Sequence, residues 1–171
     1  MDSLVIYDSM FGNTEKIARA VGDGLRVRTK VRVVPAGRVR EADWRGAALV
    51  VVGSPTRGFL PTDTLVQLLR GLDAGALGGT WAGAFDTRYR AEAIESVWLR
   101  FVVRKGGYAA ERIAAQLQRA GARLVAPPEG FFVENTEGPL EAGELERAAG
   151  WASQLLAHAD PLHGSARLPE P

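Results

Sequence analysis

Polar residues that suit a phosphate group follow the first apolar run of the chain, residues 4–7. They form the loop Asp8-Ser9-Met10-Phe11-Gly12-Asn13-Thr14, which leads directly into a helical pattern. Ser, Asn and Thr supply side-chain donors, and Gly12 lets the backbone approach a ligand closely. A helix N-terminus adds unpaired N–H groups and a partial positive charge. The loop therefore predicts a phosphate cradle without Lys or Arg. The alternative is an ordinary capped helix, since Ser, Asn and Thr are common N-cap residues.

Two more loops follow apolar runs and carry polar side chains. They are Gly53-Ser54-Pro55-Thr56-Arg57-Gly58 and Ala84-Phe85-Asp86-Thr87-Arg88-Tyr89. In an open α/β sheet, ligands bind beyond the carboxyl ends of the strands, so these loops can share one site with the first. The alternative for residues 55–58 is a plain surface turn.

Short apolar runs alternate with helical patterns along the chain. The runs are residues 4–7, 30–34, 47–52, 81–85 and 131–133. The helical patterns are residues 17–25, 65–72, 110–117 and 145–156. Such alternation implies right-handed crossovers and a parallel sheet. We predict one α/β domain over residues 1–159, a three-layer α/β/α sandwich with a five-stranded parallel sheet. Residues 160–171 are expected to form a flexible C-terminal tail.

The composition excludes several classes of protein. With 171 residues, 46% of them hydrophobic, the chain suits one globular domain. A net charge of +1 argues against a dedicated nucleic-acid binder. The absence of cysteine excludes disulfides and iron–sulfur clusters, and two histidines leave little for a metal site. No apolar run is long enough to cross a bilayer and no signal peptide is apparent, so we expect a cytoplasmic protein.

Three competing motifs fail. The chain has no Gly-Lys-Ser/Thr, which excludes a P-loop nucleotidase. Gly22-Asp23-Gly24 falls inside a helical pattern and lacks the third glycine of a dinucleotide fingerprint. Response-regulator receivers need a phosphoacceptor Asp after the third strand, where this chain has Gly53-Ser54-Pro55.

The segment Val5-Ile6-Tyr7-Asp8-Ser9-Met10-Phe11-Gly12-Asn13-Thr14-Glu15-Lys16-Ile17-Ala18 resembles the N-terminal signature of flavodoxins. The loop at 53–58 is similar to the family's flavin-flanking loop after strand three, and the loop at 84–89 falls where its other flavin loop belongs. The Ala-Phe-Asp-Thr-Arg form of that loop, with Glu137-Gly138-Pro139-Leu140, resembles a bacterial flavodoxin-like subgroup. The resemblance implies the strand order 2-1-3-4-5 and FMN as cofactor.

The resemblance also implies roles for the residues of the three loops. The phosphate of FMN would be held by Ser9, Met10, Gly12, Asn13 and Thr14, with Phe11 in the same loop. The isoalloxazine would be flanked on one side by Pro55, Thr56, Arg57 and Gly58. Its other side would be closed by Asp86, Thr87, Arg88 and Tyr89. A glycine beside the flavin can flip its peptide toward N5, so Gly58 would tune the reduction potential.

The chain departs from the family's pattern in two places. Electron-carrier flavodoxins are usually strongly acidic, whereas this chain has a pI of 8.1. Its one acidic stretch, residues 129–146 with six Glu and no base, is typical of a solvated face. Apolar residues at helical spacing over 91–104 predict an added amphipathic helix. That helix could be a lid, a dimer contact, a membrane-surface contact or extra core.

We expect an FMN-binding redox protein that transfers electrons through non-covalent FMN to a redox partner protein or a small redox substrate. No residue is predicted to be catalytic, because the flavin supplies the chemistry. One alternative is an FMN-dependent oxidoreductase acting on a hydrophobic substrate, such as a quinone reductase or a protoporphyrinogen-oxidase-like enzyme. The other is a flavin-free binding module of the same fold. The sequence leaves the oligomeric state open.

Overall fold

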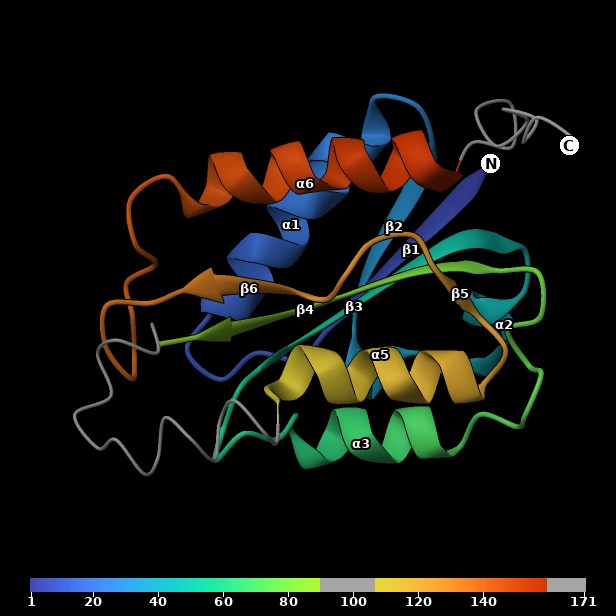
Figure 1. Cartoon of the computed structure of the whole chain (residues 1–171), viewed down its shortest axis with the longest axis horizontal. Helices are drawn as coiled ribbons and strands as arrows, with labels where there is room; N and C mark the ends of the chain where they lie inside the picture. Colours follow the sequence, from blue (N-terminus) through green and yellow to red (C-terminus); the bar gives the residue numbers. More distant parts are fainter. Residues whose placement is uncertain (90–106, 160–171) are drawn as a thin grey trace, which may run out of the picture.

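A central parallel sheet lies between two layers of helices (Figure 1). The structure, a computed structural model, describes residues 1–89 and 107–159 of the 171. Its central strands are β1 (Asp2–Tyr7), β3 (Ala47–Pro55) and β4 (Trp81–Arg88), with β2 (Lys30–Pro35) at one edge. The three-layer prediction is confirmed. The predicted helix at 91–104 and the predicted tail at 160–171 lie outside the described residues.

The strand order β2-β1-β3-β4-β5 confirms the order that the resemblance implies. The fifth position differs from the prediction because two short segments share it. The first, β5 (Arg123–Leu124), pairs with the start of β4, and the second, β6 (Glu129–Phe132), pairs with its end. Pro127 and Pro128 lie between them, and proline has no N–H to donate to a neighbouring strand. The apolar run at 131–133 reveals only the second segment.

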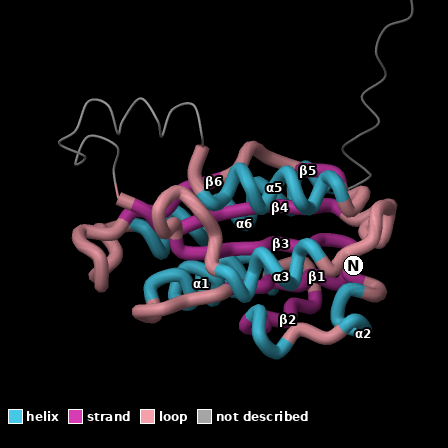
Figure 2. The backbone as a smooth tube through the Cα atoms, turned by 90° about the horizontal axis from the view of Figure 1, so that it is seen from below, coloured by secondary structure: helices cyan, strands magenta, loops and turns pink. Residues whose placement is uncertain are grey.

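Helices cover both faces of the sheet, as Figures 1 and 2 show. On one face lie α1 (Asn13–Arg26) and α6 (Glu144–Ala159). On the other lie α3 (Asp63–Arg70) and α5 (Ala109–Arg119). The connection from β2 to β3 contains a short 3₁₀ turn, η1 (Ala36–Arg38), and one turn of helix, α2 (Glu41–Trp44). Among the described residues, no helix is long and apolar enough to cross a membrane.

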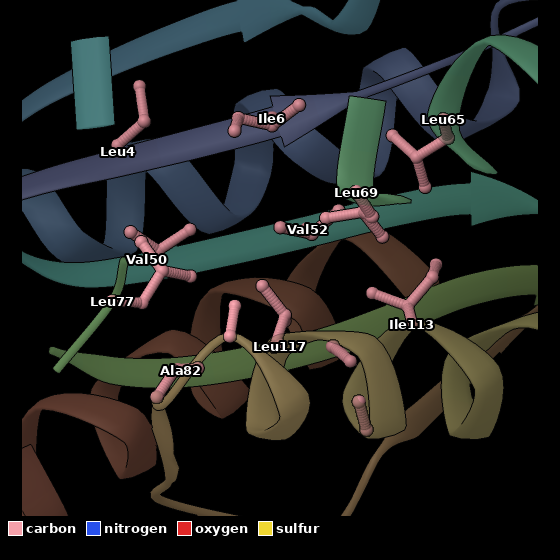
Figure 3. Packing of buried hydrophobic residues seen from close by; sticks show 14 of the residues in the cluster. Leu4, Ile6, Val50, Val52, Leu65, Leu69, Leu77, Ala82, Ile113 and Leu117 are labelled. Atoms are coloured by element: carbon pink, nitrogen blue, oxygen red, sulfur yellow. The ribbon is translucent and has the colours of Figure 1, made fainter. Parts of the chain in front are cut away.

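Continuous apolar runs form the central strands because both faces of the sheet are buried. Successive side chains of a strand point to opposite faces. Leu4, Ile6, Val50 and Val52 therefore meet α3 and α5 through Leu65, Leu69, Ile113 and Leu117 (Figure 3). On the opposite face, Val5, Leu49, Val51 and Phe85 pack with Ile17, Val21, Trp151 and Leu155 of α1 and α6.

The contact between α1 and α6 explains a glycine inside a helix. A Cβ on Gly24 would lie 2.8 Å from the backbone oxygen of Ala149 on α6, so only glycine allows this approach. Leu145, which the helical pattern places on the apolar face of α6, is 42% exposed at the first turn of that helix. The stripe that enters the core begins one turn later, at Ala148.

Candidate functional site

The loops after β1, β3 and β6 meet the ends of β3 and β4 at the carboxyl edge of the sheet, where they border an open cavity of about 630 Å³. The sequence predicts that the segments after β1, β3 and β4 share a site. The lining residues are Ser9, Met10, Phe11, Asn13, Thr14, Pro55, Thr56, Arg57, Thr87, Arg88, Tyr89, Val133 and Thr136. This volume counts all the empty space between the lining residues, including the solvent at the open mouth.

All of the predicted site residues line this cavity except Gly12, Gly58 and Asp86. Val133 and Thr136 were not predicted. The signal for them is the last apolar run, because the carboxyl end of the strand beside β4 must lie at the same edge. No carboxylate lines the cavity within the part of the chain that the structure describes, and Arg57 and Arg88 are its cations.

The loop after β1 ends in the first turn of α1. Gly12 is the N-cap residue with φ of +85°, a left-handed conformation that favours glycine. The Ser9 hydroxyl accepts a hydrogen bond from the Gly12 N–H at 3.1 Å, and the Asp8 carboxylate accepts one from the Ser9 N–H at 3.0 Å. Gly12 thus shapes the loop from behind the cavity wall, while the first-turn N–H groups have no partner inside the helix.

The two buried polar side chains of this turn connect it to other loops. The Asn13 amide donates to the carbonyl oxygen of Glu137 at 2.9 Å. The Thr14 and Thr87 hydroxyl groups lie 2.8 Å apart, and either can be the donor. Both threonines line the cavity, so one hydrogen bond joins the first turn of α1 to the end of β4.

The loop after β3 makes a tight turn beside the cavity. Arg57 and Leu60 exchange two backbone hydrogen bonds of 2.9 Å, and the residues between them, Gly58 and Phe59, have φ of +51° and +67°. A positive φ is uncommon for a bulky residue such as Phe59. Its ring makes an edge contact with Tyr108, with centroids 6.2 Å apart. Gly58 lies at the tip of this turn and not in the cavity wall.

Asp86 lies behind the cavity wall, although the resemblance implies that it closes one side of the flavin. Its side chain is 0% exposed and forms an ion pair with Arg88. The Thr56 hydroxyl and the Ala110 N–H each donate to Asp86 Oδ2 at 2.9 Å. Burial raises the pKa of the Asp86 carboxyl, although Arg88 and these two hydrogen bonds act in the opposite direction.

Arg88 and Tyr89 line the cavity at the end of β4. The Arg88 guanidinium lies over the Tyr108 ring, 3.8 Å from its centroid. The Tyr89 hydroxyl donates to the Thr136 hydroxyl at 2.6 Å, which joins the β4 loop to the loop after β6. The rim is apolar, because Met10 and Phe11 are each 50% exposed and Tyr89 is 38% exposed.

The model of the Flavodoxin family matches residues 5–151. This chain belongs to the flavodoxin family. A comparison with curated proteins gave no match. The family binds FMN non-covalently, and FMN is therefore the cofactor of this flavodoxin-like protein.

Solved structures of flavodoxins share its fold. An archaeal flavodoxin is 19% identical with a TM-score of 0.71, covering 93% of this chain and 99% of its own. Oxidised flavodoxin 1 from Bacillus cereus is 18% identical with a TM-score of 0.71, covering 92% of this chain and 99% of its own. The rubredoxin oxygen:oxidoreductase of Desulfovibrio gigas is 20% identical with a TM-score of 0.72, covering 96% of this chain but only 37% of its own.

The donor set of the cavity suits FMN. Hydroxyl groups of Ser9 and Thr14 and the free N–H groups of the first helical turn can receive a phosphate monoester. The lack of a lining carboxylate among the described residues leaves nothing there to repel its charge. Pro55, Arg57 and Tyr89 line the same cavity. The flavodoxin-like cavity therefore combines donors that suit an anion with larger side chains that can border a flat ring.

Proposed function

We propose that this chain is an electron-transfer protein that holds FMN in the cavity of the three loops and exchanges electrons with a redox partner protein. The observation that carries the proposal is that residues from separate segments gather around one cavity, with no carboxylate in its wall among residues 1–89 and 107–159, in a member of the flavodoxin family. Bound FMN would supply one- and two-electron chemistry. The residues of the chain bind it, orient it and limit its contact with water.

Each loop has its own part in this proposal. Ser9 and Thr14, with the first-turn N–H groups of α1, hold the phosphate. Pro55, Thr56 and Arg57 border one side of the ring, and Thr87, Arg88 and Tyr89 border the other. Asn13 and the Thr14–Thr87 pair keep the loops at a constant separation, since they hydrogen-bond across the gaps between them.

The apolar rim supports a protein partner. Met10, Phe11 and Tyr89 are exposed beside the cavity, and Leu60 is exposed on the neighbouring turn. Electron transfer requires close approach to the flavin, and an apolar rim gives a partner surface to bury. In this proposal the partner covers the rim for the time of the transfer and then dissociates.

An absorbance spectrum of the purified protein tests the proposal first. We expect flavin absorbance bands at about 370 and 450 nm, the wavelengths at which oxidised flavins absorb. The fluorescence of FMN should be quenched when FMN binds. FAD should bind poorly, because the phosphate-binding loop is suited to a terminal phosphate monoester. Reduced protein should then pass electrons to a small protein acceptor faster than to a soluble quinone. Faster transfer to the quinone would favour the oxidoreductase, and a failure to bind FMN would favour the flavin-free module.

A further inference from the structure

The buried carboxyl group of Asp86 connects three separate elements without reaching the cavity. One oxygen accepts from Thr56, in the loop after β3, and from the Ala110 N–H, in the first turn of α5. The other oxygen pairs with Arg88 at the end of β4. The Thr56 hydroxyl in turn accepts a hydrogen bond from the Ala109 N–H at 3.1 Å. Every known partner of Asp86 therefore belongs to the wall of the cavity or to the helix behind it.

Arg88 has close neighbours on several sides. Its Nε pairs with Asp86, its guanidinium lies over the Tyr108 ring, and its Nη2 forms a longer ion pair of 4.0 Å with Glu111 Oε2. Gly130 of β6 also lies against it, since a Cβ there would be 2.5 Å from Arg88 Nε and 2.6 Å from Cζ. The Arg88 side chain is 11% exposed, and it lines the cavity. The structure thus leaves the guanidinium one position, with the glycine providing the space for it.

The ion pair changes what Arg88 offers to a ligand. A guanidinium has five N–H donors, and the bond to Asp86 uses the one on Nε. A buried cation without a partner is costly, and the carboxylate offsets that cost. The pair therefore presents hydrogen-bond donors to the cavity with little net charge. A flavin ring, which carries carbonyl oxygens and no charge when oxidised, is the part of FMN that such donors suit.

We propose that Asp86 is a positioning residue, which holds the Arg88 guanidinium in the cavity wall so that Arg88 can donate to the ring of the bound cofactor. This inference rests on the proposed binding of FMN in the cavity. It gives Asp86 a role that acts through Arg88, in place of the direct contact that the resemblance implies.

A double-mutant cycle tests the proposal. The FMN dissociation constants of the parent, Asp86→Asn, Arg88→Gln and the double variant are measured by fluorescence quenching. Each single change is expected to weaken FMN binding about tenfold, which lies within the coupling range for residues in contact. Once Arg88 is replaced, Asp86→Asn is expected to have no further effect. Riboflavin should show the same losses, because Arg88 faces the ring and not the phosphate loop.

The midpoint potential of the bound flavin gives a second measurement, which a purely structural role would not move in this pattern. Asp86→Asn should shift the potential in the parent and leave it unchanged in the Arg88→Gln background. Asp43→Asn is the matched control. Asp43 is also a buried partner of an arginine, Arg32, at the opposite end of the sheet. The Asp43→Asn substitution should lower thermal stability without altering FMN affinity.

Gly130→Ala tests the role of Arg88 if the Asp86→Asn protein does not fold. The added methyl group displaces the Arg88 guanidinium, while the charges of Arg88 and Asp86 remain. This variant should therefore bind FMN and riboflavin as weakly as Arg88→Gln does. Equal losses from Asp86→Asn in both backgrounds would overturn the inference, and so would a Gly130→Ala protein with parental affinity. A parent protein that binds no FMN would overturn the proposed function, and this inference with it.

Discussion

Thr14 and Thr87 lie 73 positions apart in the chain, yet their hydroxyl groups meet at 2.8 Å inside the wall of the cavity. Both side chains are buried, and both border the space assigned to FMN. This hydrogen bond connects the first turn of α1 to the end of β4 and so ties the loop after β1 to that strand.

Thr14→Val should lower the free energy of unfolding of the FMN-free protein by about 1–3 kcal/mol. The change removes one hydroxyl and leaves the Thr87 hydroxyl buried without its partner. FMN affinity should fall as well, by about 1–3 kcal/mol, because a donor to a charged group is lost. Urea denaturation and fluorescence quenching measure the two effects. Thr14→Ser retains the hydroxyl and should restore FMN affinity, and a Ser variant as weak as the Val variant would contradict the assignment.

Asp86 should make the stability of the FMN-free protein depend on pH. Because burial raises its pKa, the folded protein binds this proton more tightly than the unfolded chain does. Protonated Asp86 makes its full contribution to the free energy of unfolding below the ordinary pKa of an Asp, about 4. That contribution is lost as the pH rises through the raised pKa. The unfolding free energy of the parent relative to Asp86→Asn should therefore fall as pH increases from about 4. A difference that grows with pH would mean that the Arg88 ion pair outweighs burial.

Gly58→Ala should cost about 1–2 kcal/mol of stability, because φ is +51° there and a Cβ disfavours the left-handed region. Among the described residues, no atom beyond its chain neighbours lies within 4 Å of the added Cβ, so the expected cost is conformational. If the Gly58 peptide flips beside the flavin, a redox titration should also show a shifted midpoint potential. Gly37→Ala is the control, since it meets nothing within 4 Å and has no positive φ. Identical potentials in Gly58→Ala and the parent would exclude this role.

Two helical glycines should respond to alanine in opposite directions. Gly24→Ala should destabilise the fold by about 1–3 kcal/mol, because its Cβ would lie 2.8 Å from a backbone oxygen of α6 and the helices must separate. Gly150→Ala should stabilise it by about 0.5–1 kcal/mol, since its Cβ has open space and alanine favours a helix. Thermal midpoints measure both, and a stabilised Gly24→Ala would contradict the close packing of α1 and α6.

The gathering of the loops could be predicted because parallel strands end at one edge, and the polar residues follow those ends directly. The inward direction of Asp86 could not. Asp86, Thr87 and Arg88 are polar, so the apolar run stops at Phe85, whereas β4 continues to Arg88. Once the strand is extended, alternation explains the rest: Thr87 faces α1, and Asp86 and Arg88 face α5. Val133 and Thr136 were missed for a related reason: the run at 131–133 marks a strand, but it does not show that this strand pairs with the end of β4 and so reaches the cavity.

The contact of Arg88 with Tyr108 also brings together two residues that flank residues 90–106. The Arg88 Cζ lies 3.8 Å from the centroid of the Tyr108 ring. A stretch of chain between two points that touch can change in length at a small entropic cost, about 0.6 kcal/mol for each doubling. The contact therefore fixes the two ends of this connection at one place, and a change in its length need not separate them.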